Sequence, residues 1–71
     1  MEELSKEVQK QIIEREIQNY QVNACRYTAT AKAAKRIGNQ NAVDAAQKEI
    51  EFAEGMISGL EEQLQELDTN A

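Results

Sequence analysis

The chain has 71 residues and a formal net charge of −5, with one cysteine and neither histidine nor proline. The acidic balance argues against nucleic-acid binding, which needs a basic surface, and one cysteine without histidine excludes an internal disulfide and argues against a zinc site. No apolar run approaches the length of a membrane span. We therefore expect one domain, 1–71, that is part of a larger cytoplasmic protein, with no cofactor and no membrane insertion.

The first predicted helix runs from about residue 2 to residue 37, and Glu2 and Glu3 suit the positive end of its dipole. Its apolar and small residues alternate at steps of four and three: Ile13, Ile17, Tyr20, Ala24, Tyr27, Ala31 and Ala34. This spacing places them on one side of a helix. Leu4, Val8 and Ile12 step by four instead, so the apolar line shifts near Ile12. We expect the helix to bend there, or to turn its start toward a different neighbour.

A turn is predicted at residues 37–41, which read Ile-Gly-Asn-Gln-Asn. Gly38 can adopt the left-handed conformation that ends a helix. Either Asn39 or Asn41 can cap the helix that follows. A turn this short makes the two helices antiparallel.

The second predicted helix, about 41–68, carries an unbroken ladder with alternating steps of three and four: Val43, Ala46, Ile50, Ala53, Ile57, Leu60, Leu64 and Leu67. The two ladders predict an all-α fold, an antiparallel coiled-coil hairpin with a short Gly/Asn turn. Alanines of the first helix face larger residues of the second, so the backbones should approach closely near the turn. The longer first helix should overhang at Leu4 and Val8, and residues 68–71 should form a frayed tail.

Two groups of residues off the ladders are candidates for partner binding. Phe52 and Met56 form an apolar pair one turn apart, and the basic patch includes Arg26, Lys32 and Lys35. An exposed Phe–Met pair is typical of an interaction surface, although Phe52 could instead widen the core of the hairpin. The lysines and arginine could guide an acidic partner. Alternatively, they form a solvated face that complements the second helix, because residues 1–37 carry a balance of +2 and residues 38–71 one of −7.

No residue pattern indicates catalysis. The sequence has no glycine-rich phosphate loop and no nucleophile–base pair, and its glutamates are distributed as the wet faces of two helices. Cys25 is interpreted as a semi-buried small apolar residue. We expect no enzymatic activity and no catalytic, cofactor or metal residues.

The segment 46–67 resembles the second helix of homology-region-one domains, the Rho-effector finger domains of protein kinase C-related kinases and fungal protein kinase C. The matching spacing is that of Ala53, Ile57, Leu60, Leu64 and Leu67, and the lead-in to the first helix is similar at Leu4, Val8, Ile12, Glu16 and Ile17. Where the first helix of the family often reads Lys/Arg-Glu-Gly-Ala, this chain reads Gln-Val-Asn-Ala over 21–24. The resemblance implies an antiparallel finger that binds a Rho-type small GTPase in its GTP state.

Two hypotheses for function follow. The first is a protein–protein interaction module that resembles the Rho-type GTPase-binding effector domain of a signalling protein kinase. The second is a structural module in which two hairpins pair into a four-helix bundle, because a single small hairpin has marginal stability.

Overall fold

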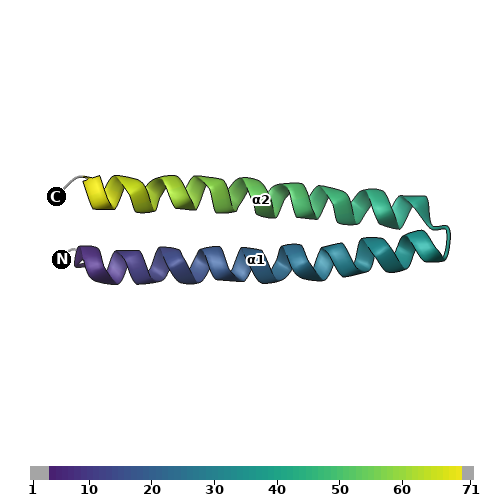
Figure 1. The fold of residues 1–71 in the computed structure, drawn as a ribbon, viewed down its shortest axis with the longest axis horizontal. Coiled ribbons are helices and arrows are strands. Elements are labelled where there is room, and N and C mark those ends of the chain that lie inside the picture. Colours follow the sequence, from purple (N-terminus) through teal and green to yellow (C-terminus); the bar gives the residue numbers. More distant parts are fainter. Residues whose placement is uncertain (1–3, 70–71) are drawn as a thin grey trace.

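The structure, a computed structural model, describes residues 4–69 as two helices, α1 (Lys6–Arg36) and α2 (Gln40–Thr69), joined by residues 37–39. The helices lie side by side and antiparallel, with the turn at one end and both chain ends at the other (Figure 1). The molecule measures 52 × 18 × 17 Å. This confirms the predicted all-α antiparallel hairpin.

The start of α1 differs from the prediction. Leu4 and Ser5 precede the helix, and the Ser5 hydroxyl caps it by accepting a hydrogen bond from the Val8 amide at 3.2 Å. The Gln9 side-chain amide donates to the Leu4 carbonyl at 2.7 Å. A start near residue 2 is therefore wrong, because the serine cap satisfies the first-turn amides four residues later. The predicted dipole contribution of Glu2 and Glu3 lies outside the described residues.

The turn follows the predicted chemistry. Gly38 has φ 73°, its amide donates to the Lys35 carbonyl at 3.1 Å, and the Asn39 amide donates to the Ala34 carbonyl at 2.9 Å. This pair of bonds is the Schellman ending of a helix, which needs a left-handed residue at the position of Gly38. The Asn39 side-chain oxygen then accepts from the Ala42 amide at 3.1 Å. Asn39, rather than Asn41, is the cap of α2, and the helix begins at Gln40.

The core is thin and built mainly from alanine. The buried residues are Ile17, Ala31, Ala34, Ala46 and Ala53, and all of them belong to the two predicted ladders. The larger ladder residues of α2 are only half-buried. No described side chain is fully enclosed, because each helix has only one neighbour. Four of these five buried residues are alanines, two from each helix.

The open end of the hairpin is nearly flush. The helices have 31 and 30 residues, and the Lys10 ammonium pairs with the Asp68 carboxylate at 3.0 Å. The predicted long overhang is wrong, because α1 starts later than expected and α2 continues through Thr69. Asp68 and Thr69 are thus helical rather than part of a frayed tail, and residues 70 and 71 lie outside the described residues. Leu4 and Val8 nonetheless remain exposed.

Candidate interaction surfaces

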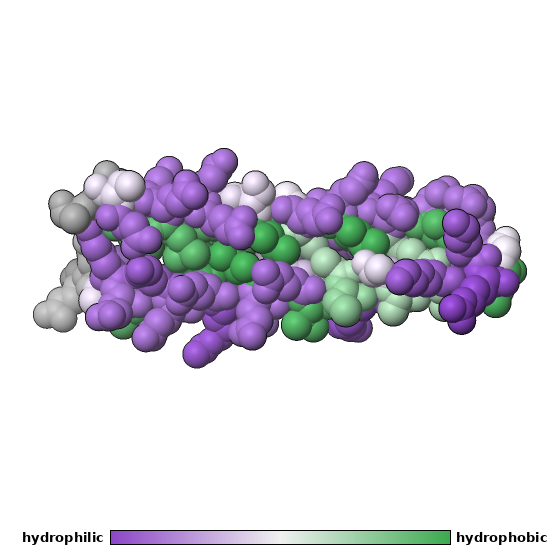
Figure 2. Space-filling model, in the orientation of Figure 1, coloured by the Kyte–Doolittle hydropathy of each residue, from purple (hydrophilic) through white to green (hydrophobic). Residues whose placement is uncertain are grey.

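The hairpin exposes more surface than a compact protein of its mass. The accessible surface is 5735 Å² for 8.0 kDa, whereas a folded monomer of this mass exposes about 4,500 Å². The radius of gyration is 16.2 Å, compared with about 11 Å for a compact domain of this length. Figure 2 shows an apolar band along the junction of the two helices, open to solvent between polar flanks. The candidate sites are therefore open surfaces on either side of this junction.

Helix geometry defines two sides of the hairpin. When each heptad is written abcdefg with the ladder residues at a and d, positions e and b lie on one side of the junction and positions g and c on the other. In an antiparallel pair, the e sides of both helices meet and the g sides of both helices meet. Near the turn, each side contains an open groove.

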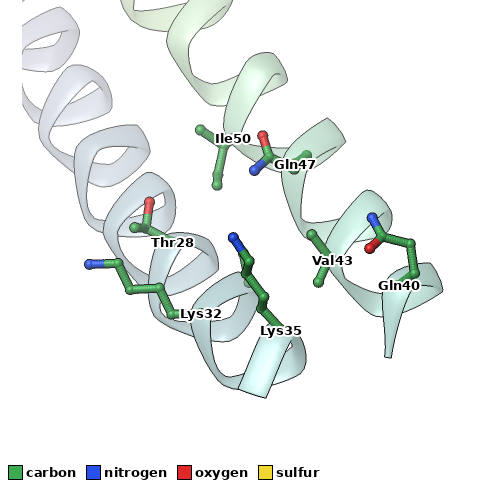
Figure 3. Close-up of a pocket in the computed structure, with 8 residues that line it drawn as sticks. Thr28, Lys32, Lys35, Gln40, Val43, Gln47 and Ile50 are labelled. Atoms are coloured by element: carbon green, nitrogen blue, oxygen red, sulfur yellow. The ribbon is translucent and has the colours of Figure 1, made fainter. Parts of the chain in front are cut away.

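The first groove lies on the e side and has a volume of about 520 Å³. Its lining residues are Thr28, Ala31, Lys32, Lys35, Gln40, Val43, Gln47 and Ile50, and we call it the lysine groove. The aliphatic side chains of Val43 and Ile50 contribute an apolar floor. The Lys35 side chain reaches into the space between the helices, whereas Lys32 points away from α2 (Figure 3). Neither ammonium group has an ion-pair partner among residues 4–69.

The second groove lies on the g side and has a volume of about 380 Å³. It is lined by Tyr27, Thr30, Ala42, Ala45, Ala46 and Glu49. One heptad beyond Ala45 on the same side of α2 lies Phe52, so this groove leads directly to the predicted apolar pair.

We call the surface formed by the exposed residues Ile12, Phe52 and Gly59 and the half-buried residues Tyr20 and Met56 the aromatic face. The ring of Phe52 packs edge-on against that of Tyr20, with centroids 6.1 Å apart and an interplanar angle of 69°. Phe52 nevertheless stays 58% exposed, so it extends the hairpin core at one ring edge and presents most of its surface to solvent. A Cβ atom added at Gly59 would meet nothing within 4 Å. The hairpin by itself therefore gives no packing reason for glycine there.

The five predicted partner-binding residues do not share one face. Phe52, Met56 and Arg26 occupy c and g positions, on the side of the aromatic face. Lys32 and Lys35 occupy b and e positions and line the lysine groove on the other side. The predicted basic patch grouped Arg26, Lys32 and Lys35. Their heptad positions, c for Arg26 and b and e for the lysines, already indicate that Arg26 lies on the opposite side of the hairpin from the two lysines.

Three further residues complete the chemistry of the surface. Cys25 is exposed, so its interpretation as semi-buried is wrong: position b lies outside the ladder. A hydrogen bond from Lys10 to Asp68, reinforced by the charge of that carboxylate, raises the pKa of Lys10.

Within residues 4–69, no cluster of three Cys, Asp or Glu side chains is placed to hold a metal ion. Neither helix combines the length and apolarity needed to cross a bilayer.

Comparisons with protein-family models, with curated proteins and with solved structures found no match to this chain. The class of protein is thus defined by the fold itself, an antiparallel two-helix hairpin with open surfaces on both sides of its junction.

Proposed function

We propose that this hairpin is a protein–protein interaction module that docks a partner protein on its aromatic face, and that the partner is a Rho-type small GTPase. The observation that carries the docking surface is Phe52, which is 58% exposed while its ring edge is held by Tyr20. The partner class rests on the resemblance of residues 46–67 to the Rho-effector finger domains.

We place the docking surface on the aromatic face because Phe52 is a large, exposed side chain that is already partly ordered. Binding energy concentrates in a few large side chains that become fully desolvated in the complex. Because the Phe52 ring already packs against Tyr20, it has fewer rotamers to lose when a partner binds. The entropy cost of ordering this side chain in the complex is therefore smaller. Met56 adds a flexible apolar neighbour, and Arg26 places a cation on the same side. The guanidinium of Arg26 has no ion-pair partner among residues 4–69.

Affinity measurements with GTP-analogue-loaded and GDP-loaded Rho-type GTPases test the proposal. Phe52→Ala should weaken binding of the GTP form by roughly thirtyfold, the loss typical of an interface anchor of about 2 kcal/mol. Val22→Ala is the matched control, because Val22 is 54% exposed and lies on the outer surface of α1. Lys32→Glu, on the opposite side, should leave the affinity unchanged. Absence of binding to every GTP-loaded Rho-type protein would refute the partner class, and equal losses for Phe52→Ala and Val22→Ala would refute the face.

A glycine pair provides a second test of the same face. Neither Gly55 nor Gly59 has a neighbour within 4 Å of an added Cβ atom, so alanine at either position should stabilise the free hairpin through helix propensity. Gly59 lies on the aromatic face and Gly55 on the outer surface of α2. If a partner backbone approaches Gly59 closely, Gly59→Ala weakens binding and Gly55→Ala does not. Unchanged affinity in both variants would exclude close approach at this point.

The second candidate function is structural pairing of two hairpins into a four-helix bundle. The specific observation in its favour is the accessible surface of 5735 Å², since pairing would cover apolar surface that one hairpin leaves open. Such a dimer should unfold at a midpoint that rises with protein concentration.

A further inference from the structure

The side of the hairpin that contains the lysine groove has opposite charges at its two ends. At the turn end, Lys32 and Lys35 line the groove. Toward the chain ends, four of the exposed e positions on the same side are acidic, Glu7, Glu14, Glu61 and Asp68, and Glu54 adds a fifth carboxylate near the middle of α2. Asp68 pairs with Lys10. At the turn end, Asp44 also lies on this side, where its carboxylate accepts a hydrogen bond from Gln40 at 2.9 Å.

The same polarity holds for the whole molecule. The half nearer the turn, residues 22–54, has five Lys/Arg and four Asp/Glu, a balance of +1. The half nearer the chain ends, residues 1–21 and 55–71, has three Lys/Arg and nine Asp/Glu, a balance of −6. Two copies aligned in the same direction would place the acidic halves together, whereas two copies in opposite directions place each acidic half beside a nearly neutral one.

We propose that a second copy of this chain packs antiparallel on the lysine-groove side, so that each groove receives the acidic half of the other copy. In this arrangement, Lys32 and Lys35 of one copy lie near Glu14 and Glu61 of the other. Twofold symmetry repeats the same contact at the opposite end of the interface. This arrangement brings Lys32 and Lys35 beside carboxylates of the other copy. Among the described residues, Asp44 is the one acidic side chain on this side at the turn end, so the two lysines outnumber it where the acidic half of the other copy lies.

The lysine-groove side also offers apolar residues and length to such a dimer. The groove floor at Val43 and Ile50 is half-buried in one hairpin, and so are Ile57 and Leu64 farther along the same side. Antiparallel packing places the floor of one copy against Leu64 of the other. A side 52 Å long and 18 Å wide has an outline of roughly 940 Å², so contact along its whole length would cover at most about 1,900 Å² on two copies, which reaches the range of stable interfaces.

This inference rests on the second candidate function, the pairing of two hairpins, and names the side and direction of that pairing. It is independent of the proposed GTPase binding, because it uses the opposite side of the hairpin. A dimer through the lysine groove leaves the aromatic face open, so either proposal can fail without the other. The test below uses the full chain alone, with no GTPase present.

Charge reversal tests the pairing by sedimentation equilibrium. We expect the wild-type chain to form a dimer, and the Lys32→Glu/Lys35→Glu and Glu14→Lys/Glu61→Lys double variants each to dissociate at least tenfold more readily. An equimolar mixture of the two double variants should restore the dimer, because each reversed end then meets an opposite charge. The matched control is Arg36→Glu/Lys48→Glu, which makes the same change in net charge at outer f positions and should dimerise like the wild type. Circular dichroism confirms that every variant remains helical.

A distance measurement tests the orientation. A spin label at Arg36→Cys in a Cys25→Ser background lies at the turn end of each copy. In the antiparallel dimer, the two labels should be about 45 Å apart, at 1.5 Å per residue along the helix. A separation typical of adjacent turn ends would refute the antiparallel arrangement.

Several other outcomes would overturn the proposal. These are a monomer at every concentration, an equal loss of dimer in the Arg36→Glu/Lys48→Glu control, and failure of the mixed double variants to pair. Dissociation of the dimer by Phe52→Ala would overturn the lysine-groove side as the interface and assign it to the aromatic face.

Discussion

The clearest test of the packing compares two isoleucines on the same helix. Ile17 is 9% exposed and Ile12 is 48% exposed, so Ile17→Ala and Ile12→Ala make the same chemical change at a buried and at a half-exposed position. Truncating a buried isoleucine costs about 2–5 kcal/mol. The low end applies to Ile17, because the open junction lets water and neighbouring side chains reach the space left behind. Alanine's better helix propensity returns about 0.4 kcal/mol at either site.

The expected net loss for Ile17→Ala is therefore about 1.6 kcal/mol, and Ile12→Ala should lose about 0.5 kcal/mol because half of its surface is already exposed. A domain of this size has an unfolding free energy of about 4–10 kcal/mol, so the first loss is a large fraction of the total. With a urea dependence of about 1 kcal/mol per molar, the unfolding midpoint should fall by about 1.6 M for Ile17→Ala and by about 0.5 M for Ile12→Ala.

The assay is urea unfolding followed by circular dichroism at low micromolar concentration, repeated at a tenfold higher concentration. Equal midpoint shifts for the two variants, or a larger shift for Ile12→Ala, would refute the argument that the ladder forms the core. If the effect of Ile12→Ala grows with concentration, Ile12 belongs to an interface between copies.

Three further predictions concern the turn, the outer surface of α2 and the open end. Gly38→Ala should lower the free energy of unfolding by about 1 kcal/mol, because φ is 73° at this position. Asn39→Ala should lower it by about 1 kcal/mol, because the variant lacks the side-chain oxygen that caps the Ala42 amide. Urea unfolding measures both losses, and no loss in either variant would contradict the observed turn. Gly55→Ala should stabilise by about 1 kcal/mol, whereas destabilisation would mean that something packs against this position. Because the Asp68 hydrogen bond raises the pKa of Lys10 above 10.5, its stabilisation should be complete below pH 10.5 and lost as the pH rises through the raised pKa. In Lys10→Gln, the unfolding free energy measured as a function of pH should no longer show this loss at high pH. An identical pH profile in the variant and the wild type would contradict the assignment of the loss to Lys10.

Local spacing alone was enough to predict much of this molecule. The alternation of three- and four-residue steps predicted both helices and their contact sides, and Gly38 marked the turn, because these signals depend only on neighbouring residues and on the period of the helix. The buried alanines also followed from the ladders. The cap at Ser5 was missed, because the sequence offers both this serine and the preceding glutamates as signals of a helix start. Only the hydrogen bond from the Val8 amide to the Ser5 hydroxyl decides between them.

The tertiary structure decided what each side of the hairpin presents. The heptad positions already indicate on which side of the junction a side chain lies, but which residues of the two helices meet there depends on how the helices pack along their common junction. That packing brings Lys32 and Lys35 together with Val43 and Ile50 in one groove and sets Phe52 against Tyr20 on the other side. The sequence by itself determined that two helices must pair, and only their packing determined which residues remain available to a partner.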